Sequence, residues 1–318
     1  MCATRASGML DFLIRPISRD EFFSSYWEKK PLHVPREEPD YYKEIVTPAG
    51  LDELISSGHL RIPALQLAKN GYYLPPETYT TNVRSGGEQF SGVVQLDRVN
   101  ALYRGGATLS LPAVQRTLAP LENFTTALEQ ELDHAVQANA YLTAAGTSGF
   151  KPHYDTHDIF VMQIGGQKHW KIYEPPIALP YRTQIFNPQT YVLPKKPVAE
   201  VTLSAGDLLY LPRGFVHTTE TSEHFSSHVT LAVTVYTWID LAIEYLQGAR
   251  ALPEFRKALP CGFTTSDDQL AESTFKLMEA LRHKSDDKAF VSRFLAQARG
   301  RRPKASVRFQ SDIGSAGD

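Results

Sequence analysis

Two residue types that bind metal ions stand two positions apart near the middle of the chain. His153 and Asp155 lie in residues 149–173, which read GFKPHYDTHDIFVMQIGGQKHWKIY. This segment is expected to be extended, and side chains two apart on a strand share a face, so both groups point into one cavity. A neutral imidazole and a carboxylate fill two of the three positions of a facial triad. The spacing therefore predicts a metal site that needs one more imidazole.

His217 is the predicted third ligand. It follows residues 205–214, AGDLLYLPRG, which predict a strand ending in a tight turn that returns a side chain to the same cavity. Two imidazoles and one carboxylate leave coordination positions open for a bidentate 2-oxo acid and dioxygen. A structural zinc ion normally has a fourth protein ligand instead. We therefore predict that His153, Asp155 and His217 bind Fe(II) and form the catalytic centre.

Lys168 is the predicted anchor of the cosubstrate. On the next expected strand it shares a face with Trp170 and Ile172, so its stem can lie in an apolar wall while its ammonium meets an anion. A dicarboxylic cosubstrate such as 2-oxoglutarate needs that cation. The alternative is an ordinary lysine exposed on a strand.

A second set of polar residues is predicted to line the same pocket. Asn139 and Tyr141 are two apart in an extended stretch and offer an amide and a phenol. Thr230 and Thr234 face the same way as one another and could add hydroxyl groups. We predict that Asn139, Tyr141 and Thr234 contribute to cosubstrate binding. From the pattern alone, Asn139 and Tyr141 would more often be ordinary sheet residues, and threonine is simply common in strands.

The other histidines are expected not to bind the metal. His157, which is followed by Asp158, shows how readily such neighbours arise in a chain with 10 histidines. His228 stands two positions before Thr230, so the two side chains should share a strand face. His228 is therefore expected to lie beside the metal site. Histidines without a partner at ligand spacing are expected to be surface or structural residues: His134, His169, His224 and His283.

The elements that position these residues are predicted to be short strands. Residues 137–238 contain runs rich in Val, Ile, Thr and aromatic residues, separated by pairs such as Gly165 and Gly166. In the clearest strand, residues 229–238, apolar side chains alternate with more polar ones, so one face is apolar and the other can line a pocket. This pattern is typical of a β barrel or a β sandwich.

The flanking regions have helical patterns. Ser18 with Glu21 forms a capping box that predicts a helix through Trp27, ended by Pro31. Residues 51–55 and 114–130 also predict helices, and the helical period returns after Trp238. We expect a mixed helical region at 1–130, a β core at 131–238, a helical region at 239–300 and a flexible tail at 301–318.

The amino-acid composition limits the classes of partner that this chain is expected to bind. The 33 basic residues balance 35 acidic ones, so the charge gives no signal for nucleic acid or anionic membranes. Only two cysteines occur, and no run of about eighteen apolar residues is present. We expect a cytoplasmic protein whose partner is a protein, a peptide or a small molecule.

Residues 22–263 resemble the JmjC family of 2-oxoglutarate oxygenases, in the cupin-4 branch that contains the ribosomal oxygenases. The resemblance rests on YWEKKP at 26–31, GFKPHYD, GDLLYLPRGFVH, SSHVTL and LPEFRKALPCGF. In that family the Lys or Arg that binds the distal carboxylate of 2-oxoglutarate stands fifteen positions after the first histidine ligand, which is Lys168 here. The family's pocket Asn and Tyr fall on Asn139 and Tyr141.

The resemblance implies a fold and an activity. The fold would be a double-stranded β-helix (cupin or jelly-roll barrel) with N-terminal helices and a C-terminal helical region. The activity would be hydroxylation of a residue of a protein or peptide, with decarboxylation of 2-oxoglutarate to succinate. Helices in residues 238–299 would form a homodimer, and the winged-helix domain of the ribosomal oxygenases is not expected here.

Three alternatives remain open at this stage. The same chemistry on an N-methyl carbon would demethylate lysine. A non-catalytic cupin module would keep the barrel and a metal ion without turnover, and a cupin of other metal chemistry would not need Lys168.

Overall fold

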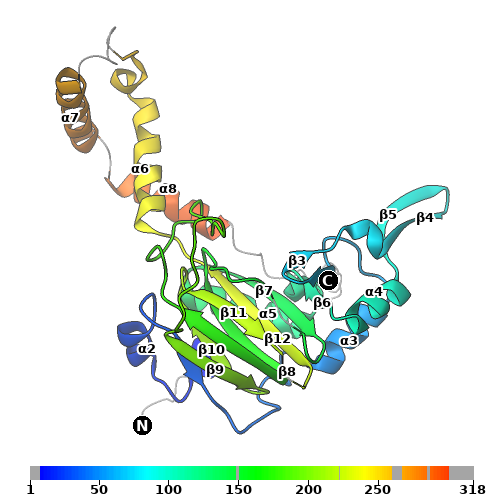
Figure 1. Cartoon of the computed structure of the whole chain (residues 1–318). Coiled ribbons are helices and arrows are strands. Elements are labelled where there is room, and N and C mark those ends of the chain that lie inside the picture. Colours follow the sequence, from blue (N-terminus) through cyan, green and yellow to red (C-terminus); the bar gives the residue numbers. More distant parts are fainter. Residues whose placement is uncertain (1–7, 148–149, 222, 260–266, 285–286, 301–318) are drawn as a thin grey trace, which may run out of the picture. The chain divides into compact units, whose positions relative to one another are not determined.

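A long central strand, β8 (Asp158–Tyr173), runs through both walls of a barrel (Figure 1). Its first half pairs with β10 (Leu208–Leu211) and β12 (Ser226–Thr234). Its second half pairs with β9 (Ala199–Ser204) and β11 (Val216–Glu220). All of these pairings are antiparallel, and they confirm the predicted β barrel.

The computed structural model divides the chain into two compact units, Met1–Val235 and Tyr236–Asp318. It describes residues 8–147, 150–221, 223–259, 267–284 and 287–300. Cys2, Cys261 and the tail predicted at 301–318 lie outside the described residues.

Gly165 and Gly166 lie where β8 passes from one wall of the barrel to the other. Gly166 has a φ of 61°, and a Cβ added there would overlap the backbone carbonyl oxygen of Phe225. The register between β8 and β12 also shifts at Ser227 and His228. Only a residue without a side chain fits this close approach, so the crossing point is fixed by sequence.

The N-terminal residues supply four strands to the same sheet, which the sequence did not predict. The order of hydrogen-bonded strands is β1-β10-β8-β12-β7-β6-β2-β3. The added strands are β1 (Leu32–Val34), β2 (Gln66–Lys69), β3 (Tyr72–Tyr73) and β6 (Thr108–Leu111), next to β7 (Ala135–Thr143). A separate hairpin consists of β4 (Thr80–Ser85) and β5 (Glu88–Val94).

The main core lies between the sheet and the helices of the first unit. Val229, Leu231 and Val233 of β12 are fully buried on this side, together with Phe22 and Leu128 from the helices. The helices are α1 (Met9–Ile14), α2 (Arg19–Ser25), α3 (Pro48–Ser56), α4 (Leu96–Arg104) and α5 (Ala119–Leu132), and the short 3-10 turns are η1 (Pro76–Thr78) and η2 (Val114–Arg116). A smaller apolar cluster fills the barrel interior around Trp170 and Leu209.

Several predicted boundaries needed correction. Ser18 caps α2 by accepting a hydrogen bond from the Glu21 amide, as expected, but the helix ends at Ser25 because Tyr26 leaves the helical region with a φ of −121°. The helix expected at 114–130 is divided into η2 and α5. The strand expected to reach Trp238 ends at Thr234, because Thr237 forms a capping box with Asp240 and starts a helix.

The second unit is helical in its described part. It contains α6 (Trp238–Gly248), η3 (Ala249–Ala251), η4 (Pro253–Arg256), α7 (Asp267–Lys284) and α8 (Asp287–Gly300). Glu244 of α6 forms an ion pair with Arg293 of α8 at 3.5 Å, and Tyr245 contacts Phe290. None of the helices in the described ranges combines the length and hydrophobicity needed to cross a bilayer.

The glycine at the crossing point gives a stability prediction. Gly166→Ala should lower the free energy of unfolding by at least about 2 kcal/mol more than Gly86→Ala, because both positions have a positive φ but only Gly166 lacks space. Chemical denaturation of the two variants measures the difference. Equal losses would show that the close approach to Phe225 does not constrain the barrel.

Candidate metal centre

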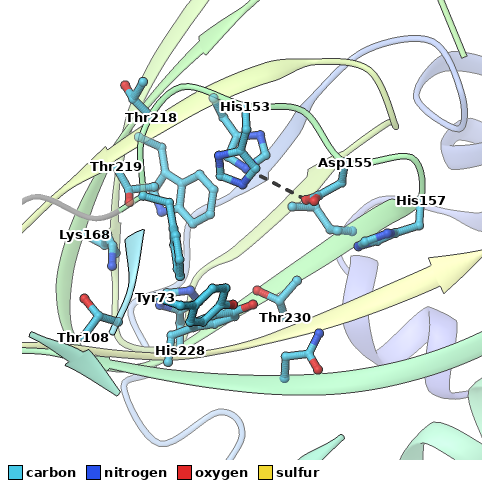
Figure 2. A pocket seen from close by; sticks show the side chains of 16 residues that line it. Tyr73, Thr108, His153, Asp155, His157, Lys168, Thr218, Thr219, His228 and Thr230 are labelled. Atoms are coloured by element: carbon cyan, nitrogen blue, oxygen red, sulfur yellow. Dashed lines mark ion pairs between the residues drawn. The ribbon is translucent and has the colours of Figure 1, made fainter. Parts of the chain in front are cut away.

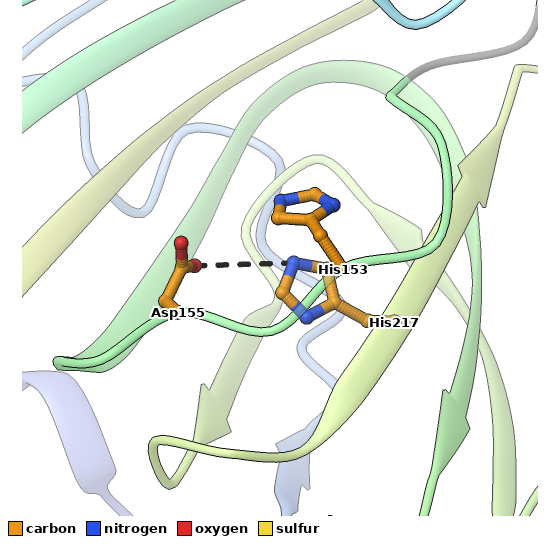
Figure 3. A group of neighbouring side chains, drawn as sticks. All are labelled: His153, Asp155 and His217. Atoms are coloured by element: carbon orange, nitrogen blue, oxygen red, sulfur yellow. Dashed lines mark ion pairs between the residues drawn. The ribbon is translucent and has the colours of Figure 1, made fainter. Parts of the chain in front are cut away.

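The three predicted ligands meet at one place. His153 and Asp155 lie just before β8, and His217 lies on β11 (Figure 3). The His217 amide donates to the His153 carbonyl oxygen at 2.9 Å, and the ring centroids of the two histidines are 4.5 Å apart. His217 Nε2 is 3.9 Å from Asp155 Oδ2. All three candidate ligand atoms lie within 4.8 Å of one another. Small side-chain movements would bring them to the spacing of roughly 3 Å that bonds of about 2 Å to one ion require.

Backbone carbonyl groups orient both imidazoles. His153 Nδ1 donates to the Lys151 carbonyl oxygen at 2.7 Å, and His217 Nδ1 donates to the Phe215 carbonyl oxygen at 3.1 Å. A histidine that donates through Nδ1 keeps the lone pair of Nε2 for a metal ion. The hydrogen bonds thus select the tautomer that a ligand needs.

The electrostatics also suit metal binding. Burial lowers the pKa of His217 to about 4, and the neighbouring His153 adds to this effect. Burial alone would raise the pKa of Asp155, but the nearby imidazoles of His157, His217 and His153 outweigh it and hold that pKa below its usual value. A neutral imidazole beside a carboxylate is the protonation state in which these groups bind a cation.

No fourth ligand joins the cluster in the part of the chain that the structure describes. His157 and His228 line the same cavity but stand outside the group of three. An ion held here would therefore keep open positions, as a catalytic metal requires.

The three ligands border a cavity of about 310 Å³ (Figure 2). Trp170 and Ile159 give it apolar walls, while Tyr73 and Phe150 also line it. The volume is at the lower end of the range for small-molecule sites. A compact ligand fits beside the metal centre.

Lys168 reaches this cavity as predicted. Its side chain is only 3% exposed, and its Nζ donates to Thr143 Oγ1 at 3.0 Å. Burial lowers the pKa of Lys168 to about 7. Among the described residues no carboxylate lies within ion-pair distance of it, so this buried amine lacks a counter-ion that an anionic ligand could supply.

Asn139 and Tyr141 also line the cavity. The side-chain oxygen Oδ1 of Asn139 accepts hydrogen bonds from the Ala113 amide and from Gln137 Nε2, which leaves the side-chain NH₂ group as a donor. Tyr141 stacks on His228 with ring centroids 5.1 Å apart. Burial raises the pKa of Tyr141, so its phenol remains a hydrogen-bond donor.

Thr234 is not in the cavity, which corrects the sequence prediction. It is exposed at the end of β12, whereas Thr230 lines the cavity. The two share a strand face, but four residues span about 13 Å along a strand. The alternation of side chains predicted the correct face of the strand for Thr234 but gave no measure of its distance from the cavity.

Sequence reasoning missed part of the lining. Tyr73 comes from the β2–β3 hairpin and Phe150 from the segment before His153, and neither had a pattern that pointed to the site. His134, His169 and His224 do not line the cavity, as expected. The side chain of His283 lies outside the described residues.

Comparison with known proteins identifies the domain. A sequence model of the JmjC domain matches residues 114–241, which include all three candidate ligands and Lys168. Ribosomal oxygenase 1 of Gallus gallus is 32% identical over 272 residues, which cover 80% of this chain and 42% of the relative. The chain is a JmjC-domain protein related to the ribosomal oxygenases.

Other relatives extend this result. The bifunctional lysine-specific demethylase and histidyl-hydroxylase NO66 of Culex quinquefasciatus is 33% identical over 249 residues, which cover 76% of this chain and 37% of the relative. This JmjC-domain chain thus spans less than half the length of these two curated relatives.

Solved structures share the fold. The crystal structure of Escherichia coli ribosomal oxygenase YcfD has a TM-score of 0.52 at 16% identity, covering 89% of this chain and 70% of that protein. A structure of YcfD with cobalt and 2-oxoglutarate has a TM-score of 0.53 at 18% identity, covering 88% and 71%. At this identity the likeness establishes the cupin-like JmjC fold.

The metal centre gives a binding prediction. His153→Ala should weaken Co(II) binding by more than about 100-fold, because loss of a ligand costs more than the 10–100-fold effect of losing a supporting partner. Isothermal titration calorimetry measures this, with His169→Ala as the control, since His169 lies on β8 and bonds to Thr202 away from the cavity. Equal affinities for the two variants would contradict the assignment of His153.

Proposed function

We propose that the chain is an Fe(II)- and 2-oxoglutarate-dependent oxygenase that hydroxylates a residue of a protein or peptide. One observation carries the proposal: a three-ligand site and a buried lysine without a carboxylate partner among the described residues border the same small cavity. The first fits an ion with open positions, and the second fits the far end of a dicarboxylic acid.

Each residue of the site would have a separate role. His153, Asp155 and His217 would hold Fe(II), while Lys168 and Tyr141 would hold the distal carboxylate of 2-oxoglutarate. When bound, Fe(II) and 2-oxoglutarate supply the activation of dioxygen, with release of succinate and carbon dioxide. The buried side chains of Ile159 and Trp170 exclude water from the wall of the site.

The lining favours a neutral substrate side chain. Asp155 is the only carboxylate that lines the cavity in the described part of the chain, and it is committed to the metal. A cationic N-methyl-lysine would therefore find no free counter-charge among the described lining residues. Since one relative is named as both a histidyl-hydroxylase and a lysine demethylase, this observation favours the hydroxylase activity.

Turnover tests the proposal. After anaerobic loading with Fe(II), the protein should form succinate on addition of oxygen and 2-oxoglutarate with peptides from a cell lysate, and mass spectrometry should find peptides heavier by one oxygen. Peptides lighter by one methylene group would favour demethylation. His153→Ala is the matched control, and wild-type protein that forms no succinate would support a non-catalytic module.

Lys168 gives a test of the cosubstrate and its pH dependence. Because the amine of the free protein has a pKa of about 7, it carries less charge as the pH rises above that value. The affinity of the metal-loaded protein for 2-oxoglutarate should therefore fall by up to about tenfold per pH unit between pH 7 and 9. Calorimetry at each pH measures it.

Two variants provide the controls for Lys168. Lys168→Arg should remove most of the pH dependence, because a guanidinium stays charged over this range. Lys168→Ala should raise the KM for 2-oxoglutarate sharply. An unchanged KM would contradict the role of Lys168 as the anchor of 2-oxoglutarate, and the absence of any 2-oxoglutarate turnover in the wild-type protein would favour a cupin that does not use a 2-oxo acid.

We also propose that the second unit forms a homodimer through α6. Trp238 is 86% exposed, and Ile239, Ile243 and Leu246 are exposed at helical spacing along the same helix. Such an apolar stripe is typical of a surface that pairs with a copy of itself. Light scattering should find a dimer that Ile243→Glu converts to a monomer and that Lys276→Ala leaves intact; a monomeric wild-type protein would contradict this.

A further inference from the structure

Three charged residues, two of them buried and one partly exposed, form a network beside the candidate metal ligands. Arg213 lies in the turn between β10 and β11, and its side chain is 5% exposed. Its Nη1 is 2.6 Å from Glu28 Oε1 and 3.5 Å from Asp158 Oδ1. Asp158, the first residue of β8, is fully buried. The network thus joins the start of β8, the turn before β11 and the N-terminal region.

The same residues connect the two segments that carry the metal ligands. The Arg213 amide donates to Asp158 Oδ1 at 2.7 Å, and the Gly214 amide donates to the Asp155 carbonyl oxygen at 3.0 Å. At the other end of these two segments, His217 and His153 form an isolated antiparallel β-bridge. Residues 153–158 therefore lie antiparallel to residues 213–217, with Asp158 and Arg213 at one end and the two imidazoles at the other.

Stability alone does not account for this network. Asp158 Oδ2 has no hydrogen-bond partner in the described part of the chain, and burial raises the pKa of Asp158 to about 6 although Arg213 opposes the shift. Apolar side chains of similar size usually stabilise a core as well as a buried ion pair does. A buried carboxylate with an unsatisfied oxygen is more useful as a geometric constraint than as a source of stability.

Glu28 is itself held firmly. Its backbone amide donates to the Tyr210 hydroxyl at 2.9 Å, and Trp27 stacks on Tyr210 with an interplanar angle of 14°. The positive φ of Glu28 turns the chain at this point. Glu28 therefore presents a fixed carboxylate to Arg213 from outside the barrel strands.

We propose that Glu28, Arg213 and Asp158 are positioning residues that hold the His217 segment at the distance from His153 and Asp155 at which one ion is shared. None of the three is a metal ligand; they act through the backbone of the two ligand segments. The inference rests on the metal centre of the proposed function and does not depend on the substrate.

Metal affinity of the full chain tests the proposal. Asp158→Asn keeps the side-chain size and one acceptor but removes the charge, and Glu28→Gln does the same at the outer, half-exposed end. We expect Co(II) binding to weaken 10–100-fold in Asp158→Asn and several-fold in Glu28→Gln, with changed Co(II) absorption spectra. Arg19→Met breaks the ion pairs of Arg19 with Asp11 and Glu131, which lie apart from the metal centre, and should leave the affinity unchanged.

The outcomes separate positioning from simple stabilisation. Wild-type Co(II) affinity and spectra in both network variants, with a lower Tm alone, would overturn the proposal. If Asp158→Asn does not fold, Glu28→Gln decides, because its side chain is partly exposed and its loss leaves Asp158 paired with Arg213. Since the readout is metal binding, failure of the oxygenase assay would contradict the proposed function and not the network.

Discussion

The geometry of the candidate metal centre depends on one backbone contact, the antiparallel bridge between His153 and His217. Two of the ligands and the third lie about sixty positions apart in sequence, so the chain must bring their segments together before any ion binds. The barrel does this because β8 crosses from one wall to the other, which places the segment before it beside the start of β11. The carbonyl groups that orient the imidazoles belong to the same two segments, so position and tautomer are fixed together.

Charge is the second constraint. A divalent ion with a single carboxylate ligand and neutral imidazoles leaves an excess of positive charge, and a protonated Lys168 adds to it across the same cavity. A dianionic cosubstrate that bridges the ion and the ammonium would neutralise both. Under the proposed function, the buried lysine and the open coordination positions therefore belong together, since each alone would be an uncompensated charge in an apolar wall.

Alternation of side chains along extended segments placed most of the predicted residues at the cavity. His153 with Asp155, and Asn139 with Tyr141, share faces because side chains alternate along an extended backbone, whatever its tertiary neighbours. Distances along a strand and contacts from remote hairpins carry no such signal. Thr234 was therefore placed too far along β12, and Tyr73 was missed because β3 is too short to show alternation. The end of β12 was also missed, since the capping box at Thr237 decides it.

The polar atoms inside the barrel fall into two groups with different consequences. Those with protein partners, such as Nδ1 of both histidine ligands, make the metal centre rigid. Those without partners in the described part of the chain include Trp170 Nε1 and His228 Nδ1, and both residues line the cavity beside Lys168. The indole and the ammonium can only donate hydrogen bonds. Because Trp170 Nε1 and His228 Nδ1 are buried within the wall, Lys168 is the group through which the proposed function would bring an acceptor-rich ligand such as a carboxylate into this part of the cavity.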